Sequence, residues 1–297
     1  MSTRFASPGR TAVRLLGFLA GLGVVFAAAF ALGGAFGPLR ESGATASDHG
    51  AGAMGAGHGA EAEGSEQAAG EGVRGLAVSE GGLTLQLAAP SAPQGRTVPL
   101  RFRILDADGR AVRDYDVTHT KRLHLIVIRR DLTGFQHLHP EISADGTWSA
   151  PLRLSRPGTY RVFADFSQRG TPRTLAADLQ VDGQVDSRPL PPPTRVASVD
   201  GLRVRLEAGA EHAGEEAELG FAVSRDGRPV ALQDYLGAKG HLVALREGDL
   251  AFLHVHPDAD RLRFMATFPS AGRYRLFLQF KAEGRVHTVA FTEEVSG

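Results

Sequence analysis

The sequence predicts an all-β protein, in which two tandem β-sandwich repeats follow an N-terminal transmembrane helix and a flexible linker. From Val73 onward, short runs alternate between apolar and polar residues and are broken by Gly, Pro and Asp about every ten residues, which is typical of antiparallel strands. Beyond the N-terminal segment, no stretch shows the period of an amphipathic helix. Motifs also recur at offsets of 114 to 120 residues, which indicates an internal duplication.

Residues 1–40 are expected to form a membrane anchor. An uncharged run, 15–37, follows basic residues and would span about 34 Å as a helix, which is enough to cross the hydrocarbon core of a bilayer. Because the basic residues precede this run, we expect a single-pass protein of the cell membrane with its repeats on the extracytoplasmic side. The alternative is a secretory signal peptide cleaved near 44–46, which would give a secreted protein. Both interpretations export the rest of the chain.

Residues 41–72 are expected to be a flexible linker. They are almost wholly Gly, Ala, Ser and Glu, with six acidic residues and no basic or aromatic ones, so they cannot bury enough apolar surface to offset the entropy of ordering. His49, Met54 and His58 lie in this linker. One interpretation is a weak metal-gathering tail, and the alternative is that these residues occur there by chance.

The duplicated part comprises repeat 1 at 73–187 and repeat 2 at 195–297. Arg188–Pro193, between them, is proline-rich and predicts a stiff connection in the polyproline conformation. The matched motifs are Asp108-Gly-Arg110 with Asp226-Gly-Arg228, Asp114-Tyr115 with Asp234-Tyr235, His124-Leu125 with His241-Leu242, His137-Leu-His-Pro140 with His254-Val-His-Pro257, and Gly158-Thr-Tyr-Arg-Val-Phe163 with Gly272-Arg-Tyr-Arg-Leu-Phe277.

Each repeat has the size and the strand pattern of a β-sandwich. A unit of about 110 residues with about seven short strands is typical of immunoglobulin-like or cupredoxin-like topology. In both copies a glycine is followed by a tyrosine at the start of a strand, Tyr160 and Tyr274. This pattern predicts a tyrosine corner, in which the phenol hydroxyl ties the strand to the loop that precedes it.

Composition excludes several classes of function. The 33 basic residues balance 33 acidic ones, so nothing draws the chain toward nucleic acid. The absence of cysteine excludes disulfides, thiolate zinc sites, blue-copper centres, iron–sulfur clusters and cysteine nucleophiles. The sequence has no phosphate-binding glycine loop, nucleophile elbow or His-Glu-x-x-His motif, so we expect no enzyme activity, with a copper enzyme lacking a thiolate ligand as a minor alternative.

Six of the 11 histidines lie at matched positions in the two repeats. Residues i and i+2 of a strand point to the same face, so a His-x-His pair can bind one ion through two imidazoles. The proline that follows each pair marks the end or edge of a strand. The matched residues are His124, His137 and His139 in repeat 1, and His241, His254 and His256 in repeat 2.

A hairpin would bring the third histidine of each repeat to its pair. A turn at Asp131-Leu132 would place His139 opposite His124 on one face. A turn at Gly248-Asp249 would do the same for His256 and His241. The prediction depends on register, because a slip by one residue would move the lone histidine to the other face.

Three neutral imidazoles suit Cu(II), Zn(II) or Ni(II), and copper has the highest affinity for such ligands. The expected cofactor is therefore copper or another divalent transition metal, bound for capture or delivery. His119 could join the first site but has no counterpart in repeat 2. The alternative is a structural or protein-interaction module of the cell envelope, with an envelope protein as partner, in which the histidines hold loops in place.

These motifs also resemble a group of bacterial exported proteins with an HxHP motif, similar to heavy-metal-associated periplasmic or cell-surface proteins. The resemblance covers both repeats, about two thirds of the chain, and is less complete in repeat 2, where His119 and Asp165 have no equivalent. It implies a β-sandwich and a part in copper or heavy-metal handling. The residues that carry it are Asp114-Tyr115, His119, Lys121, His124-Leu125, Asp131-Leu132, Phe135, His137-Leu-His-Pro140, Asp145-Gly146, Tyr160-Arg161, Phe163 and Asp165-Phe166.

Overall fold

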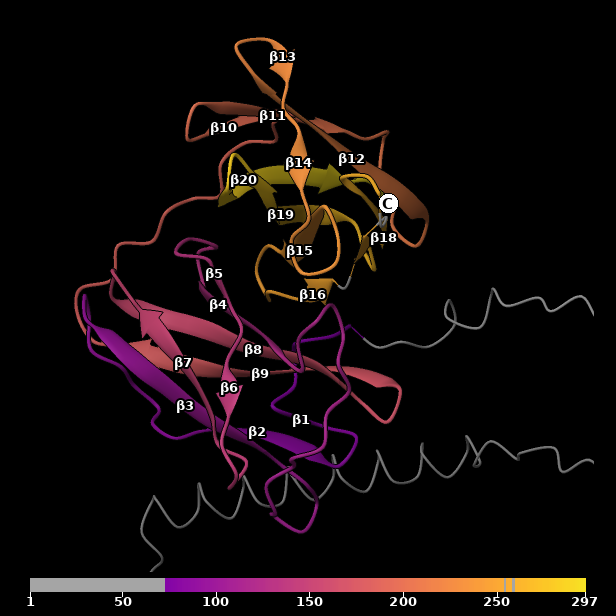
Figure 1. Ribbon diagram of the computed structural model, residues 1–297. Coiled ribbons are helices and arrows are strands. Elements are labelled where there is room, and N and C mark those ends of the chain that lie inside the picture. Colours follow the sequence, from indigo (N-terminus) through magenta and orange to yellow (C-terminus); the bar gives the residue numbers. More distant parts are fainter. Residues whose placement is uncertain (1–72, 254, 258–259) are drawn as a thin grey trace, which may run out of the picture. The chain divides into compact units, whose positions relative to one another are not determined.

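The computed structural model describes residues 73–253, 255–257 and 260–297. Every regular element in these ranges is a β-strand, so the all-β prediction is confirmed (Figure 1). The described ranges hold no helical segment that could serve as a membrane span. The anchor predicted at 1–40 and the linker predicted at 41–72 lie outside the described residues.

Repeat 1 contributes nine strands: β1 (Ser79–Glu80), β2 (Leu83–Leu87), β3 (Thr97–Leu105), β4 (His124–Arg129), β5 (Gln136–Leu138), β6 (Glu141–Ile142), β7 (Trp148–Arg153), β8 (Gly158–Gln168) and β9 (Thr171–Val181). They form a five-stranded sheet in the order β1-β2-β3-β7-β6 and a four-stranded sheet in the order β5-β4-β8-β9. The apolar faces of the two sheets meet in one core, where Phe102, Trp148 and Tyr160 are almost completely buried.

Repeat 2 contributes eleven strands: β10 (Val196–Val199), β11 (Leu202–Glu207), β12 (Glu216–Arg225), β13 (Arg228–Pro229), β14 (Leu232–Gln233), β15 (Gly240–Arg246), β16 (Phe252–Leu253), β17 (His256–Pro257), β18 (Arg263–Thr267), β19 (Gly272–Ala282) and β20 (Arg285–Val295). One sheet has the order β10-β11-β12-β18-β17, with β13 on β12, and the other has the order β14-β19-β15-β16, with β20 on β19. Both repeats are thus antiparallel β-sandwiches of the immunoglobulin-like type, as the sequence predicts.

Strands β4 and β15 are buried on both faces, because each lies between two apolar clusters. In β4, Leu125 belongs to the core of repeat 1, whereas its neighbour Ile126 belongs to a cluster that both repeats share. In β15, Leu242 belongs to the core of repeat 2, and its neighbour Val243 belongs to the shared cluster. We call the shared cluster the interface cluster; its buried members are Ile126, Ile128, Leu132, Phe163, Ala176, Leu190, Val243, Leu245, Leu250, Phe252 and Phe277.

The aromatic contacts in and beside the interface cluster are reciprocal. Phe135 stacks on Phe277 with ring centroids 4.2 Å apart, and Phe163 packs on Phe252 at 5.4 Å. In the matched hairpins Phe135 corresponds to Phe252, and Phe163 corresponds to Phe277. The two contacts therefore join equivalent residues: the residue that repeat 1 contributes to one contact is contributed by repeat 2 to the other. This is the pattern of a two-fold isologous interface.

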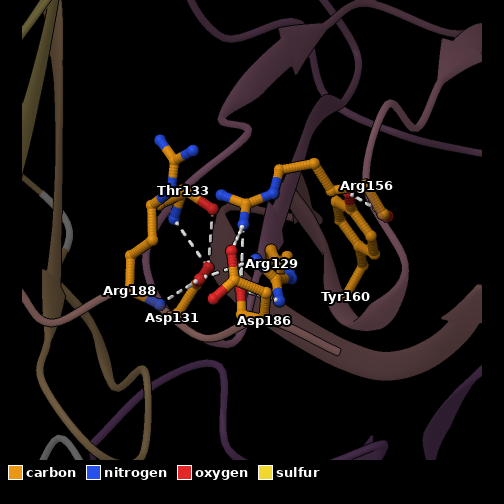
Figure 2. Close-up of polar contacts among 7 residues, drawn as sticks. All are labelled: Arg129, Asp131, Thr133, Arg156, Tyr160, Asp186 and Arg188. Atoms are coloured by element: carbon orange, nitrogen blue, oxygen red, sulfur yellow. Dashed lines mark hydrogen bonds and ion pairs between the residues drawn. The ribbon is translucent and has the colours of Figure 1, made fainter. Parts of the chain in front are cut away.

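A buried ion pair closes the hairpin of repeat 1 (Figure 2). Arg129 donates from Nη1 to Asp131 Oδ2 at 2.7 Å, and both side chains are less than a tenth exposed. Thr133 donates its hydroxyl to the other oxygen of Asp131. Burial alone would raise the pKa of Asp131, but these donors and the charge of Arg129 outweigh it and lower the pKa.

The connection between the repeats is fixed to that ion pair. The Asp186 carbonyl accepts hydrogen bonds from Arg129 Nη2 at 2.8 Å and Arg156 Nη2 at 2.9 Å (Figure 2). Two residues on, the backbone N–H of Arg188 donates to Asp131 Oδ2, and then Leu190 is buried in the interface cluster. The predicted spacer is thus held by repeat 1 at its start and by both repeats at Leu190.

Both predicted tyrosine corners are confirmed. Tyr160 donates its hydroxyl to the carbonyl of Arg156 at 2.8 Å, and Tyr274 donates to the carbonyl of Ser270 at 2.9 Å. Each bond reaches four residues back, to the loop before the strand. The rings themselves are buried in the two cores.

Repeat 2 also contains two buried carboxyl groups, Glu211 and Glu293. Arg195 Nη2 lies 3.0 Å from Glu293 Oε1 and 3.6 Å from Glu211 Oε2. Burial, followed by the charge of Glu211, raises the pKa of Glu293 to about 7 in spite of this arginine. Repeat 2 therefore contains a buried carboxyl group, Glu293 in β20, that titrates near neutral pH.

Candidate metal centre

The hairpin register on which the histidine prediction depends is confirmed in repeat 1, and in repeat 2 it is confirmed only as far as Leu253, because His256 pairs with Met265 in the other sheet. In repeat 1, Ile126 lies opposite His137 and Leu125 lies opposite Leu138. In repeat 2, Ala244 lies opposite Leu253 in the corresponding register. The side chains of β4 and β5 therefore alternate as the sequence predicts, and the strand histidine and the HxHP motif share a face.

Three imidazoles of repeat 1 converge. His124, His137 and His139 each offer one ring nitrogen, and these atoms all lie within 4.8 Å of one another. Their ring centroids are 4.9 to 5.2 Å apart. Imidazole nitrogens that bind one ion tetrahedrally at about 2.0–2.1 Å place their rings about 5 Å apart, so this triad has the spacing of a three-histidine metal site.

The partners of two rings define their protonated nitrogens. His124 Nε2 lies 3.3 Å from the carbonyl oxygen of Thr118, which can only accept, so this nitrogen carries hydrogen. His137 Nδ1 lies 2.7 Å from Oε1 of Gln279, whose amide nitrogen donates to Thr288, so it also carries hydrogen. The remaining nitrogens, His124 Nδ1 and His137 Nε2, lie 3.0 Å apart. Two lone pairs at this distance repel unless a proton or a metal cation lies between them.

The third ring adds an unsatisfied nitrogen. Nε2 of His139 is buried and has no hydrogen-bond partner among the described residues. Burial, followed by the neighbouring imidazoles, lowers the pKa of His137 to about 3; burial and the charges of His124 and Lys121 lower that of His139 to about 4. At neutral pH both rings are therefore neutral, which is the form that binds metal.

Two further histidines lie beside the triad. His241 of β15 has its ring 6.0 Å from that of His124 and 6.1 Å from that of His137. The ring centroids of His119 and His241 are 5.5 Å apart. Together with Asp165, these residues line a cavity of about 50 Å³, which has room for one or two water-sized species. Burial lowers the pKa of His241 to about 4, so it too is neutral at pH 7.

The other two predicted ligands are described less fully. His254 lies outside the described residues, and of His256 only the backbone is described, paired with Met265 in β18. The second three-histidine site therefore stays a prediction. What the structure does place is His241, whose described ring neighbours are three histidines of repeat 1 and Tyr235.

Equivalent turns hold His124 and His241. Each ring donates from Nε2 to the carbonyl of the residue six positions earlier, Thr118 or Tyr235. Both turns have two residues with positive φ, and the second of these in repeat 2 is a glycine. Thr118, rather than Tyr115, is thus the counterpart of Tyr235, so the alignment of the two Asp-Tyr motifs was wrong. Tyr115 instead lies in the core of repeat 1 and accepts a hydrogen bond from Trp148.

Gln279 belongs to the candidate site, although the sequence did not assign it there. It lies opposite His241 in the register of β15 and β19, where repeat 1 has Asp165 opposite His124. Its side chain reaches His137 in the other repeat, 142 positions away. No spacing within one repeat signals this contact. The only hint is that β4 and β15 are apolar at consecutive positions, which indicates strands covered on both faces.

Comparison with solved structures finds only weak similarities to other β-domain proteins. The chain is 17% identical to the Lin-41 filamin domain over 33% of its length and 91% of that domain, with a TM-score of 0.24. It is 17% identical to the Escherichia coli adhesin FdeC over 74% of its length and 66% of that chain (TM-score 0.26). A chimeric titin Z1Z2 tandem is 15% identical over 71% of this chain and 95% of the tandem (TM-score 0.19). Similarities with TM-scores this low do not indicate a function. No curated protein matches the sequence.

One family model matches most of the chain. A domain of unknown function, DUF8832, matches residues 77–183 and again residues 197–297. The two matches fall on the two sandwiches, which confirms the internal repeat. They do not bear on the resemblance to heavy-metal-associated exported proteins, which stays a prediction. The chain therefore belongs to the DUF8832 family and carries its domain twice.

Proposed function

We propose that this protein binds a transition-metal ion, with copper as the first candidate, through His124, His137 and His139. The observation that carries the proposal is the convergence of three ring nitrogens within 4.8 Å of one another, with the Nε2 atom of His139 buried and without a hydrogen-bond partner among the described residues. Hydrogen bonds fix two of these rings by their outer nitrogens, as metal-binding imidazoles usually are. The ligand set is preorganised and consists of neutral nitrogens.

Copper is preferred because of the donor set and the expected location. Imidazole suits copper, zinc and nickel, and copper leads the order of affinity. The apolar run at 15–37 favours a membrane-anchored protein whose repeats lie outside the cytoplasm. In that setting the site would capture an ion and pass it to a partner in the envelope. His49, Met54 and His58 of the linker would supply weak ligands on the way.

A structural role for the histidines is the second candidate, and one observation favours it. His124 and His241 each donate a ring N–H to a turn carbonyl, and both rings are buried, so each pins a turn against its strand. This role uses one nitrogen of each ring. It does not explain why the other ring nitrogens converge. A bound ion explains this convergence and is compatible with the hydrogen bonds to the turns.

The test is a competitive titration of the full chain with Cu(II) and Zn(II). The variant H124Q/H137N/H139N removes the three imidazoles but keeps an amide N–H near the position of His124 Nε2, which faces the turn, and of His137 Nδ1, which faces Gln279. We expect this variant to lose one tightly bound ion per chain. His212→Asn, which removes an exposed histidine of repeat 2, is the matched control and should bind as the wild type does. Equal uptake by the triad variant and the wild type would reject the metal site in favour of the structural role.

A further inference from the structure

The triad is oriented by the other repeat. His137 would present Nε2 to an ion only while Nδ1–H is held elsewhere, and the group that holds it is Oε1 of Gln279 in β19. A bond of this kind fixes the tautomer and the ring plane of a metal-binding histidine. Gln279 is itself held by Thr288 on β20, and its side chain is 8% exposed, so the acceptor is rigid and buried. Repeat 1 alone lacks this acceptor.

A fourth imidazole also comes from repeat 2. His241 donates from Nε2 to Tyr235, which leaves Nδ1 as the nitrogen that can bind a cation. Its ring lies 6.0 and 6.1 Å from those of His124 and His137, about 1 Å farther than rings that share one tetrahedral ion. A small closure of β15 toward β4 would complete a four-nitrogen set.

The site is continuous with a well-packed interface. Ile126 and Val243 line the same cavity as the histidines and belong to the interface cluster. The reciprocal phenylalanine contacts and the fixed connection at Leu190 hold the repeats at this surface. The packing of the two repeats therefore determines the distance between His241 and the histidines of repeat 1.

We propose that the metal site is shared by the two repeats, with Gln279 as a positioning residue and His241 as a fourth ligand, so that metal binding and docking of the repeats stabilise each other. This inference rests on the proposed metal-binding function. The coupling is reciprocal: the factor by which docking raises the affinity for the ion equals the factor by which the ion raises the docking equilibrium.

The experiment measures Cu(II) affinity and the number of coordinated nitrogens by electron paramagnetic resonance in the full chain. Gln279→Leu removes the acceptor and is expected to lower affinity about 10- to 100-fold, as losses of such partners do. Gln279→Glu keeps an acceptor oxygen and should restore most of the affinity. His241→Asn should reduce the coordinated nitrogens by one. His212→Asn is the matched control, because it removes an exposed histidine of repeat 2 that is not among the predicted ligands.

The outcomes separate the two proposals. If the triad variant binds copper as the wild type does, the metal site itself is rejected. If the triad is required but Gln279→Leu and His241→Asn both bind like the wild type, the ion belongs to repeat 1 alone and the sharing is rejected. Phe277→Ala supplies an independent check, because it weakens the interface without removing a ligand. A lower copper affinity in that variant, measured where it is folded, supports the coupling, and an unchanged one overturns it.

Discussion

Repeat 1 and repeat 2 share a framework and differ beside the histidines of the candidate metal centre. Both have the same hairpin register, a tyrosine corner, and a strand histidine that closes a turn. Opposite that histidine, however, repeat 1 has Asp165, which accepts from Thr174, and repeat 2 has Gln279, which accepts from His137. At this register position both side chains bond a threonine of the next strand, and Gln279 also accepts a hydrogen bond from the neighbouring repeat.

This difference teaches that a duplicated fold does not have to carry two equal sites. A neutral amide can orient an imidazole without adding charge, whereas a carboxylate there would favour the protonated ring. The residue opposite the strand histidine thus tunes the site while the framework stays constant. The following predictions test how equal the two repeats are.

The largest effect is expected at the reciprocal phenylalanines. Phe163→Ala and Phe277→Ala each remove a buried ring from the interface cluster and should each lower the free energy of unfolding by about 3–5 kcal/mol. Urea denaturation measures both, with the exposed Val286→Ala as control. A large cost at one position and a negligible one at the other would show that the interface is not symmetric in energy.

Metal should stabilise both repeats together. Copper at one hundred times its dissociation constant should raise the free energy of unfolding by about 2.7 kcal/mol. That corresponds to a rise in melting temperature of about 5–10 °C for a unit of this size. Calorimetry should show one transition moving as a whole, and the triad variant should not respond. Movement of only part of the transition would mean that repeat 1 holds the ion without its neighbour.

The buried carboxyl pair should make the stability of repeat 2 depend on pH. The folded pKa of Glu293 is raised to about 7 from its ordinary value of 4.5, so the folded state binds its proton more tightly than the unfolded state does. The stability that this proton contributes is complete below pH 4.5 and is lost as pH rises through 7.

Comparing Glu293→Gln with the wild type isolates this contribution. The variant should gain about 1–2 kcal/mol over the wild type between pH 5 and pH 8, a figure that allows for screening near the partly exposed Arg195. Denaturation midpoints at the two pH values measure it. The exposed Glu207→Gln should keep the wild-type dependence. Identical pH dependence in Glu293→Gln and the wild type would contradict the assignment.

The smallest effect is expected at the tyrosine corners. Tyr160→Phe and Tyr274→Phe each leave one loop carbonyl without its donor and should each cost about 1 kcal/mol. Equal shifts in the urea midpoint would sharpen the equivalence of the two repeats. A cost confined to Tyr160 would mean that Ser270, whose hydroxyl also lies near Tyr274, replaces the lost bond.

Features that depend on local pattern were predictable from the sequence. Period-two alternation predicted the strands, and the turn positions predicted the register that puts His137 and His124 on one face. The glycine before each tyrosine predicted the corner bonds. Each of these depends on residues that are close in sequence or joined by one hairpin, where the geometry of the backbone leaves few choices.

Features that depend on docking of the repeats were not predictable. The sequence assigned His241 to a site within repeat 2, because pattern within one repeat carries no information about its neighbour. The contact between His137 and Gln279 exists only because β4 and β15 pack through the interface cluster. The Asp-Tyr motifs misled the alignment since a three-residue difference in the loop moved Tyr235 onto the turn position of Thr118.

The tethering of Asp186 and Leu190 has a consequence for the intact chain. Residues 182–189 are exposed, yet Asp186 and Arg188 within this stretch are hydrogen-bonded to repeat 1, and Leu190 just after it is buried in the interface cluster. A protease that nicks this stretch should leave two fragments that still migrate as one particle and separate only in denaturant. Once the protein has folded, the covalent bond between its halves is dispensable.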